Sequence, residues 1–246
     1  MSRPLWPPPN PRPYYFAMPN EIFCQEISAS EFAILAYLLS RRERKLEPPT
    51  LLTIQRNLCI SRNTLRKYVR RLRERDWVVV QYHRFSFPLV LSLRDTLHLT
   101  STLKPRAGQF FPLPNCIFGF GLSVGELAVY GYLLFREDRE TYECWPSYRT
   151  IGAALRMSKN TVRKYVYRLE DKGYIVTEPT TVMRKDGTKW NGNLKFHIRP
   201  IREIIEQRNA EELERAERER LLYRARKIAA RTPGFTVLPS IPEGRP

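Results

Sequence analysis

Two stretches of the sequence repeat the same cationic and amide side chains at the same spacing. Residues 61–72 and 158–169 both contain an Asn-Thr pair followed by an Arg-Lys-Tyr-Val run. Arg pairs with O6 and N7 of guanine, Asn pairs with N6 and N7 of adenine, and Lys contacts guanine or phosphate. These residue types therefore indicate side chains that read base edges in the major groove of DNA.

Helical periodicity separates an inner face of each stretch from an outer one. At about 100° per residue, Leu65, Tyr68, Val69 and Leu72 share one face, which we expect to be the core side. A core does not require the remaining residues, although a solvated cationic face inherited from a duplication is an alternative. The predicted DNA-binding residues are Arg62, Asn63, Arg66, Lys67, Arg70 and Arg71 in the first stretch and Lys159, Asn160, Thr161, Arg163, Lys164, Tyr167 and Arg168 in the second.

The charge of the chain agrees with a polyanionic partner. Its 246 residues carry a formal net charge of +17, and the sequence pI is near 10.0. Nucleic acid or an anionic membrane surface would suit this charge. The longest apolar runs, residues 32–39 and 127–135, are shorter than the roughly 20 residues that span a bilayer. With no apolar signal region at the N-terminus, we expect a cytoplasmic protein without membrane contact.

Residue types that carry catalysis or bind metals do not cluster in the sequence. The four cysteines show no metal-binding spacing, and we expect them to be reduced and partly buried. The three histidines lie far apart in the sequence, and no phosphate-binding glycine loop is present. We therefore predict no enzyme activity, no cofactor, no metal site and no small-molecule substrate. A nicking enzyme with a nucleophile among the 13 tyrosines remains an alternative.

The two stretches belong to a longer repeat that predicts a helix-turn-helix twice. Residues 16–23 match 111–118 at an offset of 95, which becomes 97 after two extra residues near 137–145. Each copy contains an S-x-x-E capping box, at Ser28 and at Ser123, which predicts the start of a helix with one buried face. A short helix, a three-residue turn and a longer helix capped by Ser61 or Ser158 then follow.

Strand patterns follow each helix-turn-helix and predict a β-hairpin, or wing. The expected strands are residues 77–82 and 87–93 in the first copy and residues 174–178, 181–184 and 194–198 in the second. The second hairpin has an Asp-Gly turn and a basic tip formed by Arg184, Lys185 and Lys189. This tip would contact phosphate or the minor groove, or it is simply a soluble loop.

The fold class predicted is mainly α with small β-wings (α+β): two tandem winged-helix domains plus a long C-terminal helix. Residues 201–231 lack Pro and Gly and carry a broken apolar stripe, so they form either a solvated helix or one that self-associates. The expected divisions are a disordered Pro-rich arm 1–13, domain one 14–93, a linker 94–109, domain two 110–199, the charged helix 200–231 and a disordered tail 232–246.

The second copy resembles a known family. Residues 146–155, 158–162 and 169–175 look like the winged helix-turn-helix proteins of bacterial plasmids and mobile elements, which include replication-initiator-like proteins and transcriptional regulators. The Pro-Asn-x-Ile-Phe lead-in and the Arg-Lys-Asp-Gly wing are similar too. The resemblance is good over residues 110–198 and fainter over 15–93. The first copy departs from the pattern because it lacks an equivalent of Gly173 and its predicted wing is short and apolar.

The resulting functional prediction is sequence-specific binding of double-stranded DNA by two recognition helices and a basic wing. The resemblance implies a replication initiator-like protein or a transcriptional regulator. It also implies a location in the bacterial cytoplasm, associated with the nucleoid when the protein is bound to DNA. Because Arg62 and Arg70 correspond to Lys159 and Tyr167, the half-sites should be related but not identical. A tandem duplication predicts a direct repeat unless the linker turns one domain over. An RNA-binding protein or a scaffold that uses winged helices as interaction modules is the alternative class.

Overall fold

A computed structural model describes residues 15–83, 86–94, 110–183 and 189–229. The chain divides into two compact units, Met1–Arg199 and Pro200–Pro246. The predicted arm at 1–13, nearly all of the linker at 94–109 and the tail at 232–246 lie outside the described residues. The same is true of Arg184 and Lys185 at the predicted wing tip.

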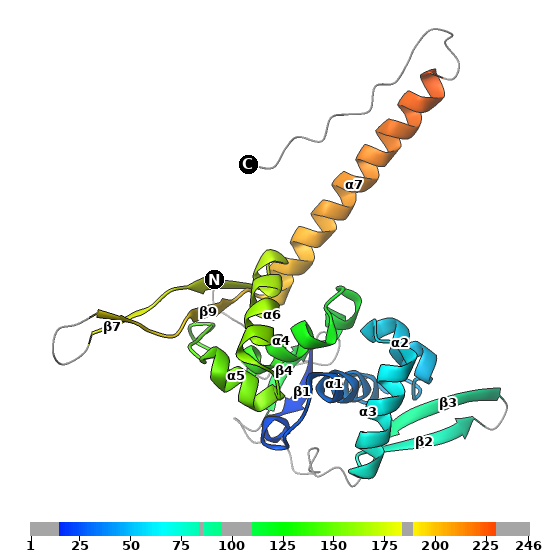
Figure 1. Ribbon diagram of the computed structural model, residues 1–246. Helices are drawn as coiled ribbons and strands as arrows, with labels where there is room; N and C mark the ends of the chain where they lie inside the picture. The colour runs from blue at the N-terminus through cyan, green and yellow to red at the C-terminus, as the bar shows by residue number, and fades with distance from the viewer. Residues whose placement is uncertain (1–14, 84–85, 95–109, 184–188, 230–246) are drawn as a thin grey trace. The chain divides into compact units, whose positions relative to one another are not determined.

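The first unit contains the two copies in the same order of elements (Figure 1). The first copy consists of β1 (Tyr15–Pro19), a 3-10 helix η1 (Asn20–Cys24), α1 (Ala29–Glu43), α2 (Leu51–Leu58), α3 (Arg62–Glu74), β2 (Val78–His83) and β3 (Ser86–Leu93). The second consists of β4 (Phe110–Pro114), η3 (Asn115–Gly119), α4 (Val124–Arg136), β5 (Glu143–Cys144), α5 (Tyr148–Leu155), α6 (Lys159–Asp171), β6 (Ile175–Glu178), β7 (Thr181–Met183), β8 (Lys189–Asn191) and β9 (Lys195–Ile198). The predicted tandem winged-helix α+β fold is confirmed.

Side-chain caps fix where the helices begin. The Ser28 hydroxyl accepts from the Glu31 backbone N–H, and the Glu31 carboxylate accepts from the Ser28 backbone N–H, so the first capping box is present. Ser123 and Glu126 form the second in the same way. Such caps satisfy backbone donors that would otherwise have no partner in the first helical turn. Local sequence therefore sets the first residue of α1 and of α4.

Both copies have a wing, but the wings differ in construction. In the first copy β2 pairs with β3 in antiparallel register, from Val78 opposite Leu93. In the second copy β9 lies between β5 and β6, and β7 pairs with β8 further along the hairpin. The strands predicted for the first wing at residues 77–82 and 87–93 are present as β2 and β3, each within one residue of the expected bounds. The glycine that the first copy lacks is not needed, because Asp76 adopts φ 60° at the position equivalent to Gly173, where φ is 72°.

Helices α1 and α4 pack against each other and join the two copies. A single buried face was expected for each of these helices, and this was wrong: α1 is buried from Ser30 to Ser40 and α4 from Gly125 to Leu134. The physical reason is that α1 and α4 pack together. Each helix buries the face of its partner that would otherwise be exposed to solvent. The approach is close at Gly131, where an added Cβ would lie 2.5 Å from Cζ of Phe32.

Strands β1 and β4 also join the copies, and their register relates equivalent residues. The antiparallel pairing places Ala17 opposite Pro112, which are equivalent residues of the repeat at the offset of 95. On either side, Phe16 lies opposite Leu113 and Met18 lies opposite Phe111. At the same offset, Phe16 corresponds to Phe111 and Leu113 corresponds to Met18, so the repeat exchanges these two pairs. A local two-fold axis therefore passes between Ala17 and Pro112.

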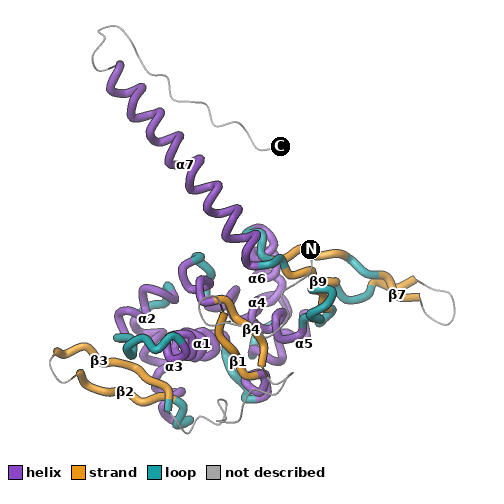
Figure 2. Tube along the Cα trace, turned by 180° about the vertical axis from the view of Figure 1, so that it is seen from behind, coloured by secondary structure: helices purple, strands orange, loops and turns teal. Residues whose placement is uncertain are grey.

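Aromatic contacts across the same interface are reciprocal. Phe23 stacks on Phe111 with ring centroids 5.7 Å apart, and the equivalent pair, Phe118 and Phe16, stacks at 6.1 Å. Phe23 also meets Tyr132 edge-on at 5.1 Å, and Phe118 meets Tyr37 edge-on at the same distance. Reciprocal contacts of this kind define a two-fold interface. The wings accordingly project to opposite sides of α1 and α4 (Figures 1 and 2).

The second unit contains one long helix, α7 (Ile201–Ala229). Salt bridges between Arg202 and Glu206 and between Arg215 and Glu219 lie along it at i,i+4 spacing. Pairs of this kind support an isolated helix modestly. Leu213 and Leu221 on this helix are exposed. Among the described residues, no helix is long and apolar enough to cross a membrane.

Candidate nucleic-acid interface

Packing of the inner faces of α3 and α6 fixes their outer faces. Leu65, Val69 and Leu72 are buried beneath α3, as predicted. Their equivalents beneath α6, listed by position, are Val162, Val166 and Leu169. Tyr68, predicted to lie in the core, is only half-buried. Because apolar residues anchor one face, the polar residues on the other face are presented to solvent in a defined order.

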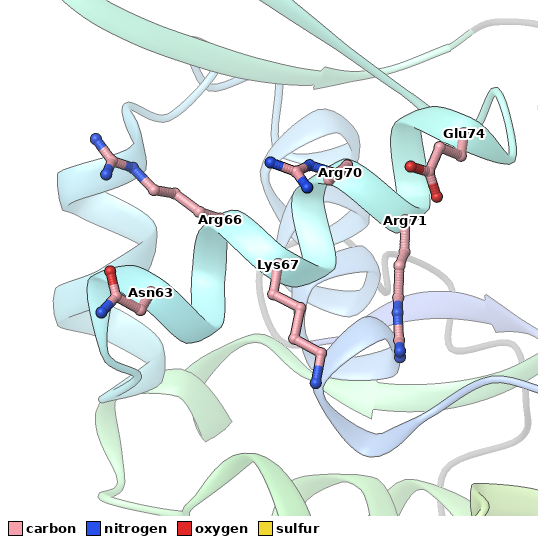
Figure 3. Close-up of a pocket in the computed structure, with 6 residues that line it drawn as sticks. All are labelled: Asn63, Arg66, Lys67, Arg70, Arg71 and Glu74. Carbon is pink, nitrogen blue, oxygen red and sulfur yellow. The ribbon is translucent and has the colours of Figure 1, made fainter.

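The outer face of α3 is cationic and hollowed. The structure places together the side chains that line an open depression of about 420 Å³: Asn63, Arg66, Lys67, Arg70, Arg71 and Glu74 (Figure 3). Six of the 13 residues of α3 are Arg or Lys and one is acidic. In Figure 3, Lys67 and Arg71 extend in the same direction from successive turns. A face of this size and charge suits a phosphate backbone with base edges beside it.

Tyr68 forms an aromatic support for two of these cations. The Nζ atom of Lys67 lies 5.6 Å from the Tyr68 ring centroid, and Cζ of Arg71 lies 5.5 Å from it. A cation within about 6 Å of an aromatic ring is attracted by the negative face of the ring. The half-buried position of Tyr68 is therefore explained: part of its ring packs inward while the remainder orients Lys67 and Arg71.

On α6 the equivalent face is arranged differently. Arg163 donates hydrogen bonds from Nε and Nη2 to the Tyr167 hydroxyl, at 3.3 Å and 3.1 Å. The first copy has Arg70 at the position of Tyr167, so Arg66 has a cation one turn further along the helix in place of a phenol. Arg163 is thus held by its own helix before any ligand binds. Arg163, Tyr167 and Lys164 are all exposed.

Tyr148 lies next to this face and was not found from the sequence. It is half-buried at the start of α5. The pKa of its phenol is raised above the ordinary value, chiefly by burial and further by the neighbouring Tyr167. The hydroxyl therefore keeps its proton at neutral pH and can donate a hydrogen bond. The only signal in the sequence that points to Tyr148 is its position in the first turn of the short helix.

Two further predicted DNA-contacting residues of the second copy have intramolecular partners. Arg168 lies 3.8 Å from the carboxylate of buried Glu126, which also accepts from Lys172 at 2.7 Å. Burial by itself raises the pKa of Glu126, but hydrogen bonds from Lys172 and Ser123 outweigh that effect and lower it overall. Thr161 is half-buried, and its backbone N–H donates to the cap residue Ser158. Arg168 and Thr161 therefore hold the helix in place, whatever they contribute to binding.

The first turns of α3 and α6 leave four predicted residues exposed. Their side chains project from the capped N-termini of α3 and α6: Arg62, Asn63, Lys159 and Asn160. In helix-turn-helix proteins this end of the second helix is the part that contacts base edges. The described part of the second wing adds Lys189, which is exposed on β8. Beside it Trp190 is 55% exposed, an aromatic side chain that charge-based reasoning overlooked.

Comparisons with known proteins identify part of this arrangement. Residues 121–175 match the model of a family described as a helix-turn-helix domain, and they run from the residues before α4 to the first residue of β6. A crystal structure of the Pi initiator protein in complex with iteron DNA is similar at 11% sequence identity, covering 74% of this chain and 94% of that chain with a TM-score of 0.45. No curated protein sequence matches. The helix-turn-helix predicted in the second copy is confirmed.

Proposed function

We propose that this chain, in which residues 121–175 form a helix-turn-helix domain, binds double-stranded DNA in a sequence-specific manner. The observation that carries the proposal is the shared outward set on α3 and α6: Asn63, Arg66 and Lys67 recur as Asn160, Arg163 and Lys164. All six side chains are exposed while the opposite helix faces are buried. Amide and guanidinium groups supply the donor and acceptor pairs that distinguish bases in the major groove.

Electrostatics supports the same proposal independently of base reading. The net charge of +17 favours a polyanion, and α3 concentrates six cations on one short element. Each phosphate neutralised by Lys or Arg releases counterions, so affinity should fall steeply with salt. Lys189 on β8 and the neighbouring Arg184 and Lys185 would add wing contacts to phosphate or to the minor groove.

Within this class we propose two biological roles. The residue pattern of the second copy resembles both replication-initiator-like proteins and transcriptional regulators of plasmids and mobile elements. Either role places the protein in the bacterial cytoplasm on DNA. Replication of an otherwise inert plasmid that carries the gene and its flanking DNA would support an initiator. Failure to replicate, together with a changed transcript level next to the bound site, would support a regulator.

The proposal is tested by selecting duplexes from a random pool with the full-length protein at about 150 mM salt. A consensus sequence is expected. The variants Arg66→Ala and Arg163→Ala should each weaken binding to that consensus by about 1–3 kcal/mol if the side chain contacts a base. Arg220→Ala, on the exposed surface of α7, is the matched control and should not change the consensus. Equal binding of random duplex, RNA and selected duplex would instead favour an RNA-binding or scaffold protein.

Absence of catalysis is part of the proposal. In the described part of the chain, no group of three His, Cys, Asp or Glu side chains is placed to hold a metal ion. A nicking enzyme would need metal ligands or an activated nucleophile near the bound strand. Incubation of the pure protein with supercoiled plasmid and Mg²⁺ or Mn²⁺ tests this point. Conversion to open circles that is lost in a Tyr167→Phe or Tyr148→Phe variant would contradict it.

We also propose that α7 mediates self-association. Support comes from the exposed apolar side chains of Leu213, Leu221, Leu222 and Ile228 on an otherwise charged helix. Leu221 and Ile228 are seven residues apart and so share one face of the helix. Burying this face against its counterpart in a second chain would remove apolar area from water.

A further inference from the structure

We propose that one copy of this chain reads an imperfect inverted repeat, with two related half-sites in opposite orientations on the duplex. The proposal rests on the proposed DNA-binding function and specifies the class of site. It differs from the direct repeat that a tandem duplication predicts. The physical basis is the two-fold relation between the copies, which the interface between them fixes.

The strand register defines the axis. In β1 and β4, Ala17 pairs with Pro112, and these residues occupy the same place in the two copies. The pairs on either side, Phe16 with Leu113 and Met18 with Phe111, are exchanged by a half-turn. A translation, as in a direct repeat, would not bring equivalent residues opposite each other in an antiparallel ladder.

Buried side chains hold the two copies in this relation. Phe16, Met18 and Phe111 are each at most 1% exposed. The reciprocal stacks, Phe23 on Phe111 and Phe118 on Phe16, lie on the two sides of the axis. Aromatic residues packed in this way lose area and dispersion contacts if the copies rotate. The orientation of the copies is therefore set by this core.

The recognition helices inherit the two-fold relation. Each packs on the long helix of its own copy, α3 on α1 and α6 on α4, and those two long helices meet at the interface. B-DNA has two-fold axes perpendicular to its length, and proteins with two-fold-related readers recognise sequences with matching symmetry. Equivalent side chains of the two helices can contact equivalent base edges only if the second half-site is inverted. Examples are Asn63 with Asn160 and Arg66 with Arg163.

The repeat should be imperfect where the outward residues of the two helices differ. They agree at the Asn, Arg and Lys positions that the two helices share. They differ at Arg62, which corresponds to Lys159, and more strongly at Arg70, which corresponds to Tyr167. Tyr167 accepts two hydrogen bonds from Arg163 and so orients it, whereas Arg70 presents a second guanidinium beside Arg66. The half-sites should match where the shared residues bind and diverge where Arg70 and Tyr167 bind.

The first test is the symmetry of the sequences selected by the full-length protein. An imperfect inverted repeat is the expected result, and a direct repeat or a single half-site would overturn the proposal. A pool without any consensus would instead mean that the proposed sequence-specific function has failed. Arg70→Tyr, which makes the outer face of α3 resemble that of α6, should make the selected half-sites more alike. Arg220→Tyr, the same change on α7, should leave them as different as in the wild type.

The second test separates one chain with two readers from two chains with one reader each. Arg66→Ala should relax selection in one half-site, and Arg163→Ala should relax it in the other. If either variant relaxes both half-sites equally, two chains are reading the site and the proposal is wrong. Synthetic duplexes that differ only in the orientation of the second half-site should differ in affinity by at least about 10-fold, since inversion introduces mismatched base pairs. Equal affinities would also contradict the proposal.

Discussion

Arg163 and Tyr167 form a hydrogen-bonded pair across one turn of α6, with the Nε and Nη2 atoms of Arg163 at 3.3 Å and 3.1 Å from the phenol oxygen. The guanidinium also lies 5.4 Å from the Tyr167 ring centroid. A side chain that is already oriented loses less conformational entropy when it binds. Helix α6 therefore presents Arg163 in a fixed direction, and α3 has no equivalent phenol.

Removal of the Tyr167 hydroxyl should weaken DNA binding without affecting the fold. In Tyr167→Phe the ring remains while Arg163 loses its acceptor, so affinity for the selected duplex should fall by about 0.5–1.5 kcal/mol. Titration of labelled duplex measures this change. Tyr223→Phe, on an exposed Tyr of α7, is the matched control. Unchanged affinity in Tyr167→Phe would show that the pair does not position Arg163 for binding.

Replacement of Glu126 by Gln should destabilise the second copy. Gln can still complete the capping box, but the ion pair between the buried carboxylate and the exposed Lys172, at 2.7 Å, is lost, at a cost of about 1–3 kcal/mol. Urea unfolding at pH 7 measures the difference. Glu206→Gln, which breaks an exposed pair on α7, should have little effect.

The same carboxylate predicts a pH dependence. The pKa of Glu126 is lowered in the folded protein from an ordinary value of 4.5, so the folded state favours the ionised form. The stability this provides is fully present above about pH 4.5 and is lost as the pH falls through the folded pKa. Unfolding curves of wild type and Glu126→Gln should therefore converge at acidic pH. A gap that stays constant down to pH 3 would argue against the ion pair as its cause.

Enlargement of Gly131 should disturb the interface between the copies. An alanine Cβ would lie 2.5 Å from Cζ of Phe32, and overpacking of this kind costs about 1–3 kcal/mol, more than the helix propensity gained. Gly131→Ala should lower the melting temperature, and a second change, Phe32→Leu, should restore part of the loss. At Gly119 an added Cβ meets no atom within 4 Å, so Gly119→Ala is the control. A stabilised Gly131→Ala protein would contradict this packing.

Lys189 on the wing should contribute charge without sequence discrimination. Lys189→Ala should leave the selected consensus unchanged and reduce the slope of log K against log salt by about 0.9, the value for one phosphate. Affinity measured at several salt concentrations gives the slope. Lys227→Ala, an equal change of charge on α7, is the control. A narrowed or altered consensus would show that Lys189 contacts bases.

Self-association through α7 has its own test. Sedimentation at increasing concentration should show a dimer of the wild type, and Leu221→Glu combined with Ile228→Glu should give monomers. Charges placed on a buried helix seam are strongly unfavourable. Ala216→Glu, at an exposed position of the same helix about 120° around its axis from Ile228, controls for the added charge. A monomeric wild type across the concentration range would contradict the proposal.

Local patterns in the sequence were sufficient to predict the elements and the outward residues of the candidate site. Caps such as Ser28 with Glu31 operate within one helical turn, and the buried spacing of Leu65, Val69 and Leu72 is a property of the helix alone. Local signals of this kind are readable because the interacting residues are neighbours in the chain. Their use as DNA contacts stays a prediction.

How the copies face each other and which cations have partners depends on contacts between residues far apart in the chain. The pairing of Ala17 with Pro112 joins residues 95 positions apart, and no local pattern encodes that register. Likewise, Arg168 meets Glu126 because α6 packs on α4. The prediction that α1 buries only one face failed because α4 covers its other face. Helix α4 belongs to the other copy, so no pattern within α1 reveals this contact. Antiparallel pairing turned a tandem duplication into a two-fold arrangement, because buried aromatic contacts between the copies are satisfied in that orientation.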